Sequence, residues 1–337
     1  MKRRFDLRDD NRPHRLRRTI QLVFLAVCVL IGWRFIQFYH ACLSSAQPVV
    51  SRPPGVDAFL PISALMSVRY WMQTGVIHPV HPAGFLIFWV IVAISFVFKR
   101  VFCSWVCPFG LLSEKLAELG VKIMRRSLTL PRWLDWPLRG IKYLLLAFFA
   151  CVIFWRMDLP SLQAFLDNPF NQLADVRLLQ FFIHPGMTTV IVLSSLVVLS
   201  VFIRHFWCRY LCPYGALTAL AGMLSPTRIK RDVSSCIDCA RCTRACPASL
   251  PVHRLLSVRS DECSLCLECI QSCPVPDTLG VKLMRTRRNV KPLVIGVAIA
   301  AAFIIVVVAG RLSRHWQTSV APAQTATLIQ ESESEQP

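Results

Sequence analysis

Acidic side chains are scarce in this chain of 337 residues, which has 19 Asp and Glu against 38 Lys and Arg and a formal net charge of +19. Such an excess of basic charge is typical of proteins that bind nucleic acid or anionic lipid. Here the basic residues flank long apolar runs and form no continuous patch, so no nucleic-acid partner is expected. The hydrophobic share of 54% and the mean hydropathy of +0.49 are too high for an ordinary soluble domain. Composition therefore predicts an integral membrane protein.

Five apolar runs are long enough to cross a hydrocarbon core, which takes about 20 helical residues. They cover residues 19–40, 83–102, 141–157, 187–206 and 292–310. The connecting segments alternate in Lys and Arg content: eight in 1–18, nine in 99–142 and fourteen in 204–291, but two in each of 41–82, 156–186 and 311–337. By the positive-inside rule, the three basic segments lie in the cytoplasm. We therefore expect a multi-pass protein of the bacterial inner membrane with an extracytoplasmic C-terminus.

The two ends of the chain carry weaker signals. The N-terminal arginine pairs are similar to a twin-arginine export signal, but no small-residue cleavage pattern follows the first apolar run. Residues 1–18 are therefore interpreted as a basic cytoplasmic anchor. Residues 311–337 are polar and poor in aromatic side chains, which predicts a disordered extracytoplasmic tail.

The most specific motif occurs twice between residues 236 and 274. "CIDCARCTRACP" and "CSLCLECIQSCP" share the spacing C-x2-C-x2-C-x3-C-P. This is the spacing of bacterial two-cluster ferredoxins, in which the fourth cysteine of each run serves the other cluster. It predicts one [4Fe–4S] cluster on Cys236, Cys239, Cys242 and Cys273, and a second on Cys263, Cys266, Cys269 and Cys246. The alternative is a pair of zinc sites with four thiolates each, which would not explain the proline after each fourth cysteine.

Three basic residues accompany these cysteines. Arg241, Arg244 and Arg254 could raise the cluster potentials or dock an acidic partner, or they could form an ordinary solvated face.

A second cysteine motif is duplicated at the ends of two apolar runs. "FCSWVCPFGLL" (102–112) and "FWCRYLCPYGAL" (206–217) both contain C-x3-C-P, and both follow an apolar run that begins after His-Pro. Because the two copies run in the same direction, a pseudo-twofold axis along the membrane normal would bring the four thiols together. These thiols belong to Cys103, Cys107, Cys208 and Cys212. They could bind a metal or cluster, form redox-active pairs, line a neighbouring cofactor, or simply fill space in a core.

Several other residues are candidates for weaker reasons. His78, His81 and His184 precede the apolar runs, with His40 nearby, and could contact a quinone or a haem, or be plain loop histidines. His205 lies at the opposite end of its run, near Cys208. Cys28, Cys42 and Cys151 have no motif spacing and are interpreted as packing residues.

Taken together, the twin C-x3-C-P motifs and the doubled ferredoxin run resemble the membrane polyferredoxins of the NapH/MauN/NosR type over roughly residues 70–280. The resemblance implies two [4Fe–4S] clusters on the eight ferredoxin cysteines. It also implies quinol dehydrogenation or electron delivery to a reductase system outside the cytoplasm. No catalytic residue follows from it, and whether the chain is itself an enzyme stays open.

The expected fold is mainly α: a polytopic membrane helical bundle of about five transmembrane helices, with a cytoplasmic 2[4Fe–4S] ferredoxin domain inserted before the last helix. Its parts are the N-terminus 1–18, a four-helix membrane domain 19–225 with an internal repeat (about 78–117 and 181–222), the ferredoxin-like domain 226–291, a fifth transmembrane helix 292–310 and the tail 311–337.

The expected function is electron transfer between the quinone pool or a cytoplasmic donor and a partner redox enzyme. Its partners would be the bilayer, a quinone or quinol and a redox protein. A further metal at the C-x3-C-P motifs is a candidate cofactor. The alternative is an assembly or metal-handling factor, such as a copper reductase for oxidase maturation, because soft thiols select Cu(I).

Overall fold

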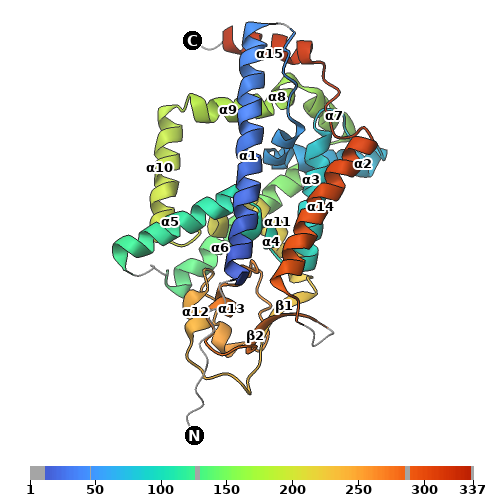
Figure 1. Cartoon of the computed structure of the whole chain (residues 1–337). Helices are drawn as coiled ribbons and strands as arrows, with labels where there is room; N and C mark the ends of the chain where they lie inside the picture. The colour runs from blue at the N-terminus through green and yellow to red at the C-terminus, as the bar shows by residue number, and fades with distance from the viewer. Residues whose placement is uncertain (1–11, 46, 126–129, 285–288, 335–337) are drawn as a thin grey trace. The chain divides into compact units, whose positions relative to one another are not determined.

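The computed structural model of the chain describes residues 12–45, 47–125, 130–284 and 289–334, which are mainly helical (Figure 1). Residues 1–11 of the expected anchor and residues 335–337 of the expected tail lie outside this part. The chain divides into two compact units, each formed from three separate segments. Unit 1 comprises residues 1–25, 91–146 and 195–302, and unit 2 comprises residues 26–90, 147–194 and 303–337.

Among the described residues, three helices are long and apolar enough to cross a membrane. They lie at Arg15–Ser44 in α1 (Arg12–Ser44), at Trp133–Arg156 in α6 (Arg132–Cys151) with its π-helical end η2 (Val152–Arg156), and in α14 (Pro292–Leu312). A fourth span would combine α9 (Ala174–Ile183) and α10 (Met187–Phe202), which are bent by 80°. Pro185 lies at this bend, where it cannot donate a helical hydrogen bond and restricts His184 before it.

The apolar run expected at 83–102 forms a shorter helix than predicted. α3 (Pro82–Phe98) has 17 residues, and its first residue is a proline, which suits the first turn of a helix. It ends before Lys99, which adopts a left-handed φ of 60°. Three clear spans are therefore present where five were expected, and the fifth crossing and the sidedness of the termini stay predictions.

The internal repeat forms two similar turns in unit 1. In the first copy, α4 (Val101–Trp105) leads into α5 (Pro108–Met124); in the second, the π-helical turn η3 (Trp207–Leu211) leads into α11 (Pro213–Met223). Cys107 and Cys212 are the N-cap residues, and each is followed by a proline at the first helical position. Proline is favoured there because its ring fixes φ and its missing N–H would have no helical partner.

The ferredoxin segment of unit 1 has short elements. An antiparallel pair, β1 (Thr227–Arg231) with β2 (Leu279–Leu283), brings together the two ends of the segment and aligns Ile229 with Val281. Alternate residues of both strands are buried, as a half-covered ribbon requires. Between the strands lie α12 (Arg241–Ala245), η4 (Val252–Arg254) and α13 (Glu268–Gln271).

Unit 2 is helical throughout its described elements. Besides parts of the long helices, they include η2, α9, η1 (Pro54–Phe59), α2 (Pro61–Thr74), α7 (Leu159–Asp167), α8 (Pro169–Gln172) and α15 (Pro322–Ser334). One core cluster packs Met66 of α2 against Ile153, Leu162 and Leu166.

The expectation of a disordered tail is wrong for residues 322–334, which form α15. Ala326 and Ile329 are fully buried against Phe38 and Cys42 of α1 and Val176 of α9. Because they are three residues apart, both apolar side chains lie on one helix face. The composition of the segment is polar overall, so it did not indicate this short apolar stripe. Cys42 packs in this core as predicted, whereas Cys151 is exposed.

Candidate functional site

The four cysteines predicted for the first cluster line one cavity of unit 1. Cys236, Cys239 and Cys242 come from the first ferredoxin run, and Cys273 comes from the end of the second. Arg231 Nη1 donates to Cys236 Sγ at 3.2 Å.

The second predicted set lines a separate cavity. Cys263, Cys266 and Cys269 meet Cys246 of the first run there. The remaining wall is largely apolar and includes Ile229, Leu250, Val252 and Val258. The exchange of the fourth cysteine between the runs thus exists in the fold, as the two-cluster pattern requires.

The backbone of the two runs bends in the same places. Asp238 and Leu265 occupy equivalent positions and have left-handed φ values of 49° and 53°; Ala240 and Leu267 do the same at 55° and 66°. Left-handed φ is costly for residues other than glycine and persists where the surroundings demand a particular path. Here that path wraps each run around its cavity.

The donor set matches what two iron–sulfur clusters need. A zinc site would take four thiolates on one ion, whereas a cube attaches each of four thiolates to a different iron. Eight thiolates in two sets of four are the ligands that two [4Fe–4S] clusters need.

The loop that carries the second set is fixed to the helices of unit 1 by backbone contacts. Ser104 Oγ donates to the Ser264 carbonyl at 2.6 Å, and Trp105 Nε1 donates to the Leu265 carbonyl at 3.2 Å. Lys99 Nζ donates to the Ser260 carbonyl at 3.1 Å. The residues around Cys263 and Cys266 are therefore held directly against the first C-x3-C-P motif.

Ion pairs strengthen the same attachment. Glu262 is buried between Arg100, whose Nη1 lies 3.0 Å from Glu262 Oε2, and Lys142. Arg17 of α1 pairs with Glu268 at 2.8 Å and with Glu114 of α5 at 2.6 Å.

The two C-x3-C-P motifs contact each other reciprocally. Cys103 Sγ lies 3.7 Å from Thr218 Oγ1 of the second copy, and Cys208 Sγ lies 3.8 Å from Ser113 Oγ of the first. Ser113 and Thr218 each follow the first cysteine of their own motif by ten residues, so they are equivalent positions. Such crosswise contacts are what the proposed pseudo-twofold relation predicts.

The motif thiols are close enough to influence one another. Burial, together with the neighbouring Cys103 and Cys212, raises the pKa of Cys208 to about 12. Burial also raises the pKa of Cys107 well above its usual value, with Cys208 and Cys103 adding to the rise. Without a bound metal, these thiols would be protonated at neutral pH.

Glycines allow both motif turns to close. A Cβ atom on Gly110 would lie 2.0 Å from the Cys103 carbonyl oxygen, and one on Gly215 would lie 3.2 Å from that of Cys208. Both turns therefore bring the carbonyl of the first cysteine close to the glycine that lies three residues after the second cysteine. A side chain at that position would crowd this carbonyl.

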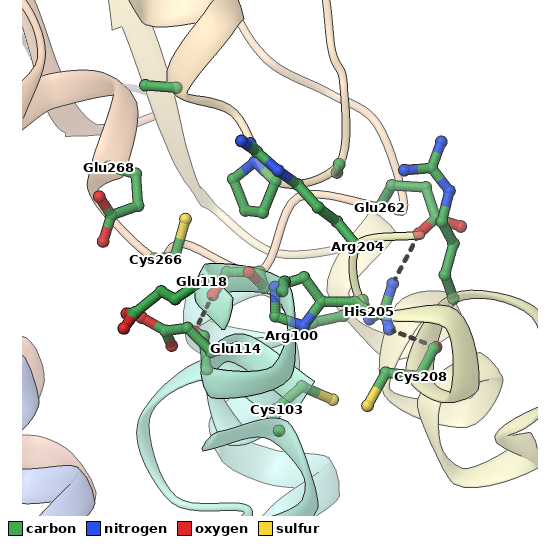
Figure 2. Close-up of a pocket in the computed structure, with 18 of the residues that line it drawn as sticks. Arg100, Cys103, Glu114, Glu118, Arg204, His205, Cys208, Glu262, Cys266 and Glu268 are labelled. Atoms are coloured by element: carbon green, nitrogen blue, oxygen red, sulfur yellow. Dashed lines mark hydrogen bonds and ion pairs between the residues drawn. The ribbon is translucent and has the colours of Figure 1, made fainter. Parts of the chain in front are cut away.

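A larger cavity of about 520 Å³ connects the motif thiols with the second ferredoxin set. Its lining includes Cys103 and Cys208 on the motif side and Cys266 on the ferredoxin side (Figure 2). Charged side chains line much of the remainder: Arg17, Arg100, Glu114, Glu118, Lys122, Arg204, Arg209, Glu262 and Glu268. His205 lines it as well.

The three histidines predicted as quinone or haem contacts lie in unit 2, and the structure does not bring them together as ligands. His81 has both ring nitrogens engaged, Nδ1 with Asp57 Oδ1 at 3.0 Å and Nε2 with the Asn171 carbonyl at 2.8 Å. His78 pairs with Asp167 at 3.3 Å. His184 is exposed at the bend before α10. His81 is therefore a structural residue in a buried polar network that also includes Arg52.

Of the polar residues that line this cavity, sequence reasoning had singled out only His205, although the repeat contains a signal for Arg100 as well. Arg100 and His205 each precede the first cysteine of their motif by three residues. They are equivalent positions with different chemistry, and an alignment of the two copies would have singled them out.

Comparison with known proteins agrees with these observations. The profile of a 4Fe–4S binding domain matches residues 80–127 and 185–232, the two copies of the repeat, and that of a 4Fe–4S dicluster domain matches residues 228–274. No solved structure matches the chain.

Curated relatives share most of the chain. The putative electron transport protein YccM of Escherichia coli is 43% identical over 278 residues, covering 82% of this chain and 77% of that protein. Protein NirI of Paracoccus denitrificans is 31% identical over 82% of this chain but only 37% of its own length. The methylamine utilization ferredoxin-type protein MauN of Methylobacillus flagellatus is 27% identical over 73% of this chain and 79% of its own. The chain therefore belongs to the family of membrane-associated, ferredoxin-type electron-transport proteins that includes YccM, NirI, MauN, NapH and NosR.

Proposed function

We propose that this protein exchanges electrons between the quinone pool and a partner redox enzyme through two [4Fe–4S] clusters. Cys236, Cys239, Cys242 and Cys273 hold one cluster, and Cys263, Cys266, Cys269 and Cys246 hold the other. The alternation of basic segments supports a cytoplasmic position for the ferredoxin segment. A quinol gives up two electrons whereas each cluster takes one, so two adjacent clusters suit the exchange.

The observation that carries this proposal is the cavity shared by the motif thiols and Cys266. Residues of both C-x3-C-P motifs and of the second ferredoxin set line this same cavity. About 30 Å of hydrocarbon is too far for direct electron tunnelling at useful rates. A lipid-soluble carrier that reaches this space would solve the problem, because it moves through the bilayer with its electrons.

The test is anaerobic purification of the full chain, with iron and sulfide analysis and EPR of the reduced state. We expect about eight iron atoms per chain, the content of two [4Fe–4S] clusters, and reduction of the clusters by a short-chain quinol in membranes. A clear excess of iron would show that the C-x3-C-P thiols also bind iron.

A matched pair of variants serves as the control. Cys266→Ser should remove the EPR signal of one cluster, whereas Cys151→Ser, at an exposed cysteine outside both motifs, should leave both signals. A protein without any [4Fe–4S] signal, or clusters that dithionite reduces but no quinol does, would contradict the proposal.

A further inference from the structure

The two copies of the repeat differ chemically at one position beside the cavity. The guanidinium of Arg100 is held by two hydrogen bonds: it donates to Glu262 Oε2 at 3.0 Å and to the Cys208 carbonyl at 3.3 Å. Its counterpart His205 lies in a turn with a left-handed φ of 56°. No hydrogen bond to the His205 ring is formed by any residue in the described part of the chain. In Figure 2 this ring is drawn among the cavity-lining residues, between the sulfurs of Cys103 and Cys266.

Helix α5 separates the cavity from an apolar surface. Glu114, Ala117, Glu118, Val121 and Lys122 of this helix line the cavity. The same helix exposes a stripe of large apolar side chains: Phe109, Leu112, Leu119 and Ile123. A helix with one apolar and one charged face lies in the interfacial plane of a bilayer. In a membrane protein this stripe is therefore covered by lipid, and the cavity lies one helix away from it.

The size of the cavity fits a small organic ligand, and its lining offers groups that can accept protons. Cavities of about 300–1,000 Å³ hold small ligands and cofactors, and this one has about 520 Å³. Its carboxylates are of two kinds, since Glu114 is paired with the buried Arg17, whereas Glu118 is half-exposed and is paired with Lys115 at the surface. A neutral imidazole accepts a proton at one ring nitrogen.

We infer that this cavity is the quinone-binding site and that His205 accepts a proton from the bound quinol. The inference rests on the proposed function and names its substrate site. In the oxidation, both quinol O–H bonds break and the two ring C–O bonds become carbonyls. One proton goes to a His205 ring nitrogen and the other to the carboxylate of Glu118. The two [4Fe–4S] clusters, which the eight ferredoxin cysteines would hold, would supply the one-electron acceptors for the two electrons. Quinone reduction is the same exchange in reverse.

The site is tested first by binding, with a photoreactive azido derivative of a short-chain ubiquinone and of menadione on the purified full chain. Peptide mass spectrometry should find the label within residues 108–124 or 204–209. Val121→Trp fills the cavity and should lower labelling at least tenfold. Leu119→Trp adds the same side chain to the exposed face of the same helix. Because surface substitutions usually have small effects, it should leave labelling within about twofold of the wild type. Both variants should keep the iron content of the wild type.

The role of His205 is tested separately. His205→Asn keeps a hydrogen-bonding side chain that tolerates a left-handed φ but cannot take the proton. We expect labelling within threefold of wild type, a quinol-dependent rate of cluster reduction at least tenfold lower, and unchanged reduction by dithionite. His184→Asn, at the exposed histidine of unit 2, should change neither the labelling nor the reduction of the clusters by quinol or by dithionite.

The outcomes separate the two proposals. If Val121→Trp is labelled and reduced by quinol like the wild type, or if the label maps to the histidines of unit 2, the site is elsewhere and only the inference falls. If quinol reduces the wild-type clusters not at all and no label attaches, the proposed function itself falls.

Discussion

At the scale of single residues, the two cluster sets differ in the charges beside them. Burial raises the pKa of Cys266 to about 12, and the adjacent Arg17 opposes that rise. Burial also raises the pKa of Cys263, and Lys99 and Arg100 oppose that rise. The first set has Arg231 against Cys236. Arg241, Arg244 and Arg254 are all exposed, as in an ordinary solvated face, and Arg244 donates to the Cys239 carbonyl at 3.1 Å.

This difference predicts unequal reduction potentials. Each added electron makes a cluster more negative, and the second set has more nearby cations than the first to stabilise that added charge. Arg17→Gln should therefore lower the midpoint potential of the cluster on Cys263, Cys266, Cys269 and Cys246 and leave the other unchanged. An EPR-monitored potentiometric titration measures both. The matched control is Arg15→Gln, at an exposed position of the same helix, which should shift neither. Equal shifts of both clusters in Arg17→Gln would contradict the charge argument.

At the scale of elements, α15 shows how a short helix gains order from packing. Isolated helices of this length are marginal in water, so its stability depends on its contacts with α1. Besides the buried Ala326 and Ile329, Tyr39 donates to Glu333 at 2.5 Å and Gln330 donates to the Cys42 carbonyl at 2.8 Å. The polar side chains that suggested disorder thus supply two of the contacts.

Ile329→Asp should release α15, because it would bury a carboxylate without a partner in the cluster around Phe38. Limited proteolysis of the solubilised protein, followed by mass spectrometry, should show new cleavage within residues 322–334. Thr327→Asp places the same carboxylate on the exposed face and should leave the cleavage pattern of the wild type. Identical patterns for the two variants would show that the packing of Ile329 does not hold the helix.

At the scale of the whole chain, unit 1 is assembled from three distant segments, and two of them, 91–146 and 195–302, meet at Glu262. Its carboxylate is shared by Arg100 and Lys142, and all three side chains are almost fully buried. Removing one partner of a buried ion pair typically costs about 3–5 kcal/mol, because the remaining charge is left without compensation. The ferredoxin segment and the helices of unit 1 therefore depend on each other for stability.

Glu262→Gln should lower the thermal unfolding temperature of the detergent-solubilised protein and reduce its iron content, with loss of the second cluster before the first. Circular dichroism and iron analysis of the same sample report the two effects. Asp277→Asn makes the same chemical change at an exposed residue of the ferredoxin segment and should have neither effect. If both variants unfold together with the wild type, the buried ion cluster is not what joins the segments.

The parts of this site that the sequence predicted are those encoded over short distances. The spacing of Cys236 to Cys246 and of Cys263 to Cys273 is a local pattern, and so is each C-x3-C-P turn. The large cavity is not local, since it depends on pairs such as Arg17 with Glu268, which are 251 residues apart. The sequence left the roles of His78 and His81 open, because a histidine beside a proline looks the same whether its ring nitrogens are free or hydrogen-bonded within the fold.

The reciprocal contacts of Cys103 with Thr218 and of Cys208 with Ser113 have an evolutionary consequence. The thiol of each first cysteine contacts a hydroxyl group of the other copy. An ancestor with a single copy could have completed this arrangement only as a symmetric homodimer, in which every substitution appears twice. Joining the copies in one chain removed that restriction. The two equivalent positions could then carry different residues, with an arginine at position 100 that forms an ion pair and a histidine at position 205. Duplication thus allowed the two copies to take on different roles.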